Sequence, residues 1–319
     1  MSASTHPVIS MPARFWKIAL IVYLALFVYG FLILHAVEDR NRIMNELWDL
    51  GHVAGYFSLI FFVYKTSRVF SGLSWRLQLL VAVTAASVLG LIIEVIQFYT
   101  GRSFSINDVY LNIVGTLTGV AIFSNWNKFL SKKIVWLLRV LVLLLWLTVS
   151  RDAIVYSLDA IHARQQFPSL ISLEYPFELS RFNGAKVHVE VVQFEQHDVI
   201  EAEFMPAKYS TLTLDHFPRD WTGYKTLKLD LYNEQDEEAE IHLRIHDIAH
   251  FPHVSYTDRF NASYPLQPGW NTVQISLEAV RQAPRGREMD MTKIHQLMLY
   301  FFRQTENRRI LIRRIGLEK

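Results

Sequence analysis

Apolar residues gather in five long runs before residue 150, whereas the second half of the chain alternates apolar and polar positions. The runs cover residues 15–36, 50–64, 77–99, 106–123 and 134–149. Each approaches the ~17–25 residues with which an α-helix crosses the hydrocarbon layer. In lipid such runs must be helical, because their backbone groups find no water partners. We therefore predict an α-helical polytopic membrane bundle of about five transmembrane helices.

The first run follows Arg14 and Lys17, an arrangement that signal peptides share. It is longer than the ~7–15 residues of a signal-peptide core, and no small-x-small cleavage site follows it. We expect it to be retained as the first membrane helix.

After about residue 170 the hydrophobic period becomes two, which is typical of half-buried strands. The clearest segments are 186–192, 199–204, 226–231 and 239–245, and 270–277, 295–301 and 308–317 alternate less strictly. Turn signals separate them at Asn183-Gly184, at Asn233 with the acidic run after it, and at Pro268-Gly269. These features predict an all-β antiparallel, jelly-roll-like sandwich, with a short helical turn at 278–280.

Residues 152–166 keep a helical spacing at Ile154, Leu158 and Ile161, up to Pro168. They either extend the fifth helix or form a surface connector. We expect a membrane domain at 1–150, a connector at 151–183 and a sandwich domain at 184–319.

Lysine and arginine in the loops predict the orientation of the bundle. With five spans, one side carries Arg14, Lys17, Lys65, Arg68, Arg76, Lys128, Lys132 and Lys133. That side should be the cytoplasm of a plasma (inner) membrane, which places the sandwich outside the cytoplasm. The net charge of +2 gives no indication of nucleic-acid binding. The absence of cysteine excludes disulfides, thiolate metal sites and a cysteine nucleophile.

Polar residues inside the predicted spans are the main candidates for function, because such groups are rarely tolerated in lipid without a role. Asp49, His52 and Tyr56 open the second helix on one face, and Glu94 and Gln97 close the third. Arg102 follows in the loop, and Asp108 and Asn112 open the fourth helix. The predicted topology brings all of them to one depth near the outer boundary. Gly115 and Gly119 form a GxxxG pair, which allows another helix to approach closely.

This pattern resembles the VanZ-like family of bacterial membrane proteins. The matching stretches are DLGHVAGY (49–56) and EVIQFYTGRSFSINDVYLNIVG (94–115), within a resemblance that covers about residues 15–125. Members of the family have been associated with resistance to glycopeptide antibiotics, teicoplanin in particular. The resemblance implies an envelope membrane protein, and we do not carry the resistance role over to this chain.

Two interpretations of the polar residues remain open. In the first they form a ligand site at the outer leaflet, with Asp49, His52, Glu94 and Asp108 as acid–base candidates and Arg102 as a phosphate partner. In the second they lock the helices together as the pairs Glu94–Arg102, Asp108–Asn112 and Asp49–His52. One histidine among scattered carboxylates has no diagnostic ligand spacing, so we expect neither a metal nor a cofactor.

The second half resembles galactose-binding-like and carbohydrate-binding-module sandwiches. The stretches that carry this resemblance are RIHD (244–247), DRFN (258–261) and LQPGWNTVQISL (266–277), in which the tryptophan is expected in the core. His242, His246, His250 and His253, with Asp247 and Asp258, could line a metal or sugar site, but we favour a polar strand face running into an exposed loop. Tyr224, Tyr256 and Trp221 are candidates for stacking on sugar rings.

Taken together, these patterns predict a protein that binds or handles a glycan or a lipid-linked envelope component at the outer face of the membrane. The alternatives are a membrane enzyme acting on a lipid-linked glycan or phosphate, and an anchored assembly protein without a small-molecule site. The expected partners are the lipid bilayer and that glycan or lipid. We expect no nucleic acid, and the sequence identifies no protein partner.

Overall fold

The structure is a computed structural model that describes residues 12–32, 42–99, 104–124, 126, 129–251 and 255–319. It consists of two compact units, residues 1–154 and 155–319, which we describe separately. The boundary between them falls inside a continuous helix that runs from Lys132 to Gln166.

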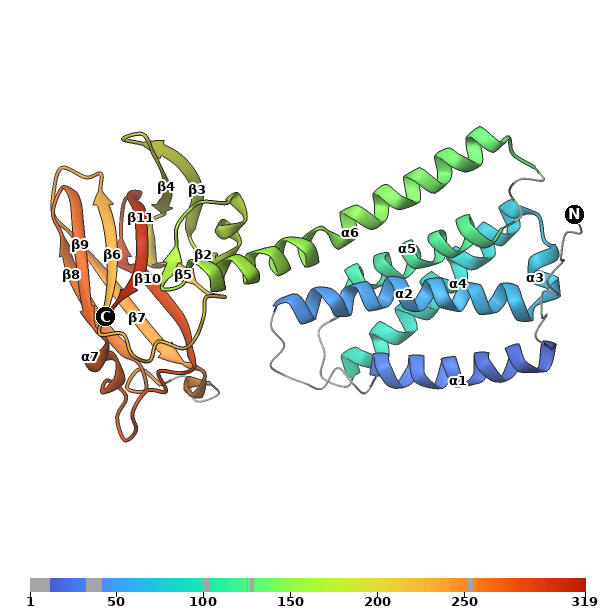
Figure 1. Ribbon diagram of the computed structural model, residues 1–319, viewed down its shortest axis with the longest axis horizontal. Coiled ribbons are helices and arrows are strands. Elements are labelled where there is room, and N and C mark those ends of the chain that lie inside the picture. Colours follow the sequence, from blue (N-terminus) through green and yellow to red (C-terminus); the bar gives the residue numbers. More distant parts are fainter. Residues whose placement is uncertain (1–11, 33–41, 100–103, 125, 127–128, 252–254) are drawn as a thin grey trace, which may run out of the picture. The chain divides into compact units, whose positions relative to one another are not determined.

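The first unit is helical (Figure 1). Its elements are α1 (Ala13–Leu32), α2 (Arg42–Thr66), α3 (Arg68–Gly72), α4 (Trp75–Tyr99), α5 (Ile106–Phe123) and the first part of α6 (Lys132–Gln166). Within the described residues, α2, α4, α5 and α6 are long and apolar enough to cross a membrane. The protein is therefore a multi-pass membrane protein. The sequence predicted about five spans, and α1, with 20 residues, is a further helix outside these four.

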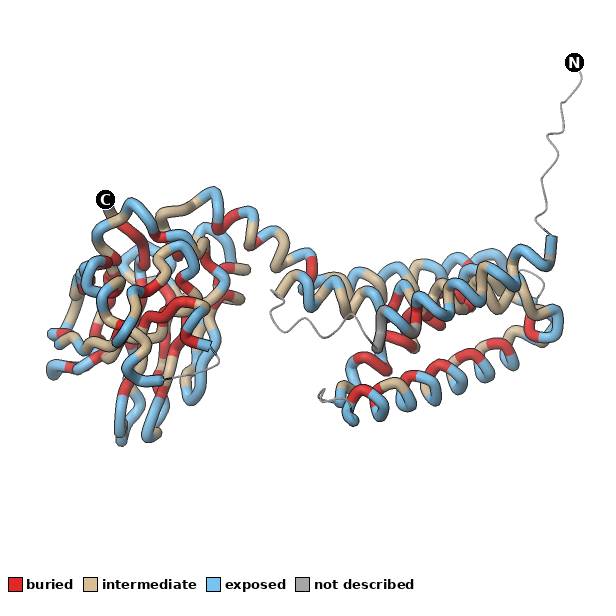
Figure 2. Tube along the Cα trace, turned by 90° about the horizontal axis from the view of Figure 1, so that it is seen from below, coloured by how far each residue is buried: buried red, intermediate tan, exposed pale blue. Residues whose placement is uncertain are grey.

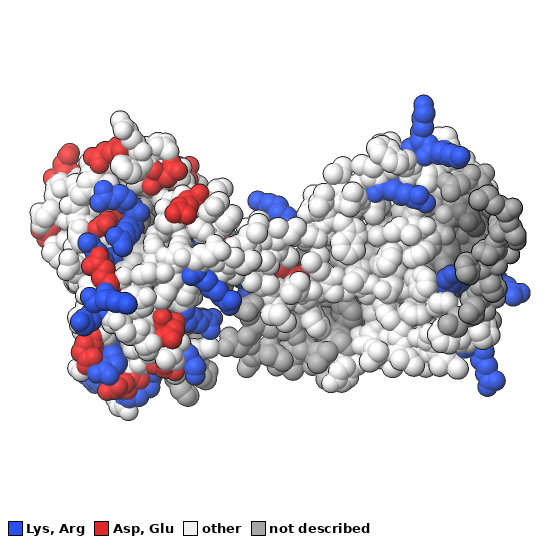
Figure 3. Space-filling model, in the orientation of Figure 1, with Lys and Arg blue, Asp and Glu red and all other residues white. Residues whose placement is uncertain are grey.

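Helix α5 is the centre of this unit. Of its apolar stretch 61% is buried by other helices, against 22% for α2 and for α4. The other helices leave apolar side chains on the outside, as the exposed stripes along them show (Figure 2). On the face seen in Figure 3, charged side chains gather over the second unit and are sparse over the helices. This distribution suits a bundle surrounded by lipid.

The second unit begins with the end of α6 and continues as an antiparallel sandwich of two sheets. One sheet has the order β3 (Val187–Phe194), β4 (His197–Phe204), β11 (Arg308–Glu318), β6 (Thr226–Asn233) and β9 (Gly269–Ser276), with β1 (Ser169–Ile171) paired to β11. The other has the order β2 (Phe182–Ala185), β5 (Ala207–Leu214), β10 (Ile294–Gln304), β7 (Ala239–Asp247) and β8 (Phe260–Leu266). The short elements are η3 (Pro176–Arg181), η4 (Ile248–His250) and α7 (Leu277–Arg281).

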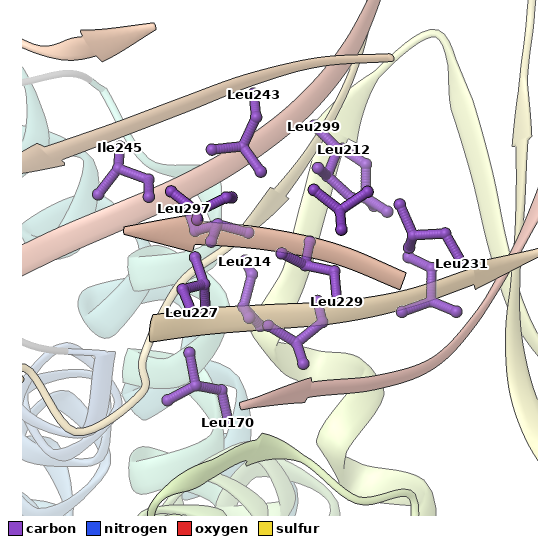
Figure 4. Close-up of a cluster of buried hydrophobic side chains, with 14 of the residues drawn as sticks. Leu170, Leu212, Leu214, Leu227, Leu229, Leu231, Leu243, Ile245, Leu297 and Leu299 are labelled. Atoms are coloured by element: carbon purple, nitrogen blue, oxygen red, sulfur yellow. The ribbon is translucent and has the colours of Figure 1, made fainter. Parts of the chain in front are cut away.

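Leucine and isoleucine side chains from both sheets form the core between them (Figure 4). Leu229 from one sheet and Leu243 from the other are each at most 1% exposed, and Trp221 is fully buried. Burying one such side chain contributes about 1.5–3 kcal/mol. The sandwich is therefore held by its own core.

The predicted sandwich is confirmed, and so are the seven alternating segments and the helical turn, which is α7. The prediction missed β1, β2, β5 and β8. Asn183-Gly184 lies inside β2, so it does not form the predicted turn. Trp270 was expected in the core but is only half-buried, because its position in β9 places it outside the sheet, where it contacts Tyr232. Trp221 fills the core instead.

A buried ion pair joins the end of α6 to the sandwich within the second unit. The Arg181 guanidinium contacts both Asp159 carboxylate oxygens, at 2.9 and 3.1 Å from Nε, and donates to the carbonyl of Leu170 at 2.8 Å. Glu178 accepts a backbone N–H bond from Ser172 and lies 3.4 Å from His162 Nε2. This network fixes where α6 ends and the first strand begins.

Candidate functional site

His52 is the centre of a polar cluster between α2 and α5. Its Nδ1 lies 3.0 Å from Asn112 Oδ1, and its Nε2 lies 3.3 Å from Asp108 Oδ2. His52, Asp108 and Asn112 are all at least 96% buried. The helical spacing of Asp108 and Asn112, four residues apart, places both on the face of α5 that meets α2.

Ser105 ties α4 to the beginning of α5. Its hydroxyl accepts from the Asp108 backbone N–H at 3.3 Å and donates to Asp108 Oδ1 at 2.7 Å, so Ser105 is the N-cap of α5. Its own backbone N–H donates to Glu94 Oε2 of α4 at 2.7 Å. Carboxylates are stabilised at a helix N-terminus by the helix dipole and the unpaired N–H groups there. The carboxylates of Glu94 and Asp108 both contact Ser105 at the N-terminus of α5.

Three glycines allow the helices to approach closely enough for these contacts. A Cβ atom on Gly115 would lie 2.3 Å from the Val53 carbonyl oxygen, and one on Gly119 would lie 2.6 Å from Ile60 Cβ. On α4, a Cβ atom on Gly90 would lie 2.8 Å from Asn112 Nδ2. A larger residue at Gly115 or Gly119 would push α2 away from α5, whereas one at Gly90 would displace the Asn112 side chain.

The remaining predicted residues lie around this centre. Asp49 Oδ2 accepts from Asn107 Nδ2 at 3.5 Å near the exposed edge. Tyr56 is 1% exposed, and its ring lies 5.5 Å from that of Phe27. Gln97 is also buried. Arg102 lies outside the described residues.

The expectation that Asp49, His52 and Tyr56 open the second helix was wrong. Helix α2 begins at Arg42, seven residues before Asp49, which is about 10 Å along a helix axis. Polar residues before Leu50 hid this start, because the apolar run begins later than the helix.

Sequence reasoning also missed Ser105, Asn107 and Gly90. Ser105 had a signal, since a serine three residues before Asp108 fits an N-cap. Gly90 had none, because nothing in the sequence shows which residue of α5 passes over it.

The cluster is suited to accepting hydrogen bonds and moving a proton. Each carboxylate oxygen can accept two hydrogen bonds. A histidine beside a carboxylate can serve as donor or acceptor near neutral pH. Among the described residues, no group of three histidine or acidic side chains is arranged to hold a metal ion.

The histidines of the sandwich form the expected polar strand face only in part: His242 is half-buried on the outer face of β7. His246 and His250 are fully buried, and His253 lies outside the described residues. Burial lowers the pKa of His246 to about 4, so this side chain is neutral at physiological pH. For His246 and His250 the expectation failed because η4 folds back over the end of β7 and brings the two rings to 4.6 Å from each other.

Arg287 holds the two aspartates that accompany these histidines. Its guanidinium contacts Asp247 Oδ2 at 2.6 Å and Asp258 Oδ1 at 2.6 Å. Burial opposes ionisation of Asp247. The hydrogen bonds from Arg287 and from the Asp290 backbone N–H, together with the charge of Arg287, outweigh it and keep the pKa of that carboxyl below its usual value. This group stabilises the loop that follows β7.

Comparison of the second half with solved structures finds sandwiches of the predicted kind. The family 11 carbohydrate-binding module from Clostridium thermocellum, in complex with a β-1,3-1,4-mixed-linked tetrasaccharide, is 14% identical over 47% of this chain and 94% of its own, with a TM-score of 0.38. A cellulose-specific module, CBM28, is 13% identical over 48% of this chain and 93% of its own, with a TM-score of 0.36. An exo-β-agarase matches at 13% identity over 47% of this chain and 24% of its own, with a TM-score of 0.39. Such weak likenesses do not indicate a shared ligand.

The helical half of the chain matches a known protein family. No curated protein matches the chain. The model of the VanZ/LLP1 family matches residues 4–127, the segment that contains the His52 cluster and its supporting glycines. The motifs around Asp49, Glu94 and Asp108 predicted this match, and the N-terminal helical region of the protein is similar to the VanZ/LLP1 family over these residues.

Proposed function

We propose that the VanZ-like domain binds the head group of a lipid-linked glycan at the outer leaflet of the plasma membrane. The observation that carries this proposal is the buried cluster of His52, Asp108 and Asn112, which membrane-spanning helices hold with Glu94 close by. The sandwich would lie on the same, outer side of the membrane.

Energetics support a role beyond helix packing. A charged side chain in a membrane helix costs up to about 2.5–3.5 kcal/mol on insertion scales, the value for the helix centre, and Glu94 and Asp108 lie nearer the helix ends. A hydrogen bond between membrane helices returns only about 0.6–2 kcal/mol. Apolar residues and the close contacts at Gly115 and Gly119 would join α2 to α5 without that penalty. Retaining two acids and a histidine therefore favours a ligand site.

The chemistry of the cluster favours sugar hydroxyls. Oxygen atoms of Glu94, Asp108 and the Asn112 amide can accept hydrogen bonds. The His52 ring can act either as a hydrogen-bond donor or as an acceptor. An acceptor-rich site suits a ligand with many O–H donors, which describes a sugar better than a bare phosphate. Arg102, if it reaches the site, would add a donor for a phosphate linked to the sugar.

Orientation is part of the proposal and rests on the charge bias of the loops. Reporter fusions after Lys133 and at Lys319 test it. A cytoplasmic signal at the first site and an external signal at the second agree with the proposal. A cytoplasmic signal at Lys319 would place the sandwich on the wrong side.

Binding can be tested with purified protein in lipid nanodiscs. The probe is a polyprenyl-diphosphate monosaccharide, compared with the same polyprenyl diphosphate without sugar. We expect His52→Gln and Asp108→Asn to weaken binding of the sugar-bearing lipid at least tenfold. Ser58→Ala is the control, because Ser58 lies on the same helix and its hydroxyl donates to the Ala54 carbonyl.

Equal binding by all variants at equal thermal stability would refute the proposal. Consumption of the lipid during the assay would identify the domain as an enzyme. In that case the rate should depend on pH, because His52 and Asp108 would exchange protons with the substrate.

A further inference from the structure

The outer face of the five-stranded sheet carries a group of polar and aromatic side chains that the membrane site does not use. On β7, Leu243 and Ile245 face the core, so His242 and Arg244 face outward. The register places His242 opposite Tyr300 and Arg244 opposite Met298 on β10. On the other side of β7, Arg244 is opposite Asn261 of β8. We call this surface the Arg244 face; its members are Tyr209, Thr211, His242, Arg244, Tyr256, Arg259, Asn261, Met298 and Tyr300.

Two arginines on this face lack an acidic partner. Within the described part of the chain, neither Arg244 nor Arg259 forms an ion pair. Arg244 Nε is buried without a hydrogen-bond partner, and its Nη2 lies 3.4 Å from His250 Nε2. Arg259 Nε donates to Asn261 Oδ1 at 3.0 Å.

Two acids near these arginines in the sequence already pair with another arginine. Asp258, next to Arg259 in the sequence, contacts Arg287 at 2.6 Å, and Asp247 contacts the same guanidinium at 2.6 Å. The positive charge of the Arg244 face is therefore not balanced by its own loop. Burial and the nearby charge of Arg259 lower the pKa of Arg244 to about 10, which still leaves it charged at neutral pH. An anion bound here would offset both the burial of the Arg244 charge and its repulsion by Arg259.

Flat aromatic rings adjoin the two arginines. Tyr256 is 65% exposed and lies under the Arg259 guanidinium at 5.1 Å. Tyr300 stacks on His242, with ring centres 5.0 Å apart, and Tyr209 lies 6.3 Å from Tyr300. Exposed tyrosines offer an apolar plane together with a hydroxyl, which is the combination that sugar rings use.

We propose that the Arg244 face binds a glycan whose sugars carry carboxylate groups. Arg244 and Arg259 pair with the carboxylates, since a guanidinium and a carboxylate form planar, charge-assisted hydrogen bonds. Tyr256 and Tyr300 contact the sugar rings. The inference deepens the proposed function by naming a sugar class for the sandwich, and its site does not depend on the membrane cluster.

The test uses the full-length protein in detergent and polygalacturonate as the probe, with a neutral galactan for comparison. We expect polygalacturonate to bind and the galactan to bind at least tenfold more weakly. Arg244→Gln and Arg259→Gln should each weaken binding of polygalacturonate about tenfold or more, and raised salt should weaken binding by the wild type. Tyr256→Ala should weaken it several-fold.

Arg313→Gln is the matched control. Arg313 lies on the other sheet, where its guanidinium is 4.3 Å from the Trp270 ring, so it is also an arginine on an aromatic surface. This variant should bind like the wild type. Arg259 and Tyr256 lie in or beside a surface loop, so their variants keep the test valid if Arg244→Gln fails to fold.

Three results would overturn the inference. The first is equal binding of the neutral galactan, and the second is binding that survives Arg259→Gln and Tyr256→Ala. The third is equally tight binding of poly-glutamate, which would identify an acidic peptide as the ligand class. His52→Gln and Asp108→Asn should leave polygalacturonate binding unchanged, so failure at one site is distinguishable from failure at the other.

Discussion

Replacing Gly115 with alanine would place a Cβ atom 2.3 Å from the backbone carbonyl oxygen of Val53. No change of rotamer can remove this contact, because both atoms are fixed to helix backbones. Ordinary contact begins at 3.4 Å, so α2 and α5 must separate by about 1 Å. The same shift would stretch the contact between His52 Nδ1 and Asn112 Oδ1, which now measures 3.0 Å.

The size of the effect follows from two opposed terms. Overpacking in a tight contact costs about 1–3 kcal/mol. Alanine is the better helix former by about 1 kcal/mol, which offsets part of it. We expect Gly115→Ala to lower the free energy of unfolding by up to about 2 kcal/mol and to weaken ligand binding at the His52 cluster.

Gly51 supplies a matched control on α2. None of the described atoms lies within 4 Å of a Cβ atom placed there. Gly51→Ala should therefore be neutral or stabilise the protein by up to about 1 kcal/mol. Unfolding of both variants in mixed detergent and SDS micelles measures the difference. Equal stability of the two would refute the close contact between α2 and α5.

Three further predictions concern other parts of the chain. Arg181→Met should destabilise the sandwich by about 3–5 kcal/mol, because the Asp159 charge stays buried without its partner. The control is Arg151→Met, which removes an exposed pair with Asp152 and should cost at most about 1 kcal/mol in the same unfolding measurement. Burial lowers the pKa of His246 from 6.5 to about 4, so the folded state binds fewer protons than the unfolded state between these pH values. The free energy of unfolding should therefore fall as the pH drops from about 6.5 to 4, by at most about 3 kcal/mol. A pH profile of thermal unfolding that His246→Gln leaves unchanged would contradict this. Ser105→Ala should destabilise the start of α5 by about 1 kcal/mol, and Ser105→Thr should restore most of the loss in an unfolding titration.

The order of elements was largely readable from the sequence. Long apolar runs can only be helices in lipid, so local patterns were sufficient to predict α4 and α5. Strict alternation can only bury one face of a strand, which was sufficient to predict β4 and β6. β8 was missed although Phe260, Ala262, Tyr264 and Leu266 alternate with other residues along it. β8 contains Pro265 and lies at the edge of its sheet, where proline is tolerated. β2 contains Asn183 and Gly184, which read as a turn until β5 pairs with them.

His52, Asp108 and Asn112 of the polar cluster were named from the sequence, but their contacts were not. Spacing placed Asp108 and Asn112 on one face of α5, and the sequence alone supported that statement. Which partner each of them meets depends on how α2 and α4 lie against α5, and Gly90, Gly115 and Gly119 determine this through close contacts. His52 therefore meets both Asp108 and Asn112 of α5.

By itself, the sequence determined the membrane bundle, the sandwich and the residue types of the polar cluster, because hydrophobic period and residue chemistry act locally. Only the tertiary structure decided that Trp221, and not Trp270, fills the core, and that His246 and His250 are buried. It also decided that Asp247 and Asp258 pair with Arg287, so that Arg244 and Arg259 have no acidic partner among the residues that the structure describes. Pairing of charges depends on which side chains the fold brings within a few ångströms, and residues 40 positions apart in the chain carry no local signal of it.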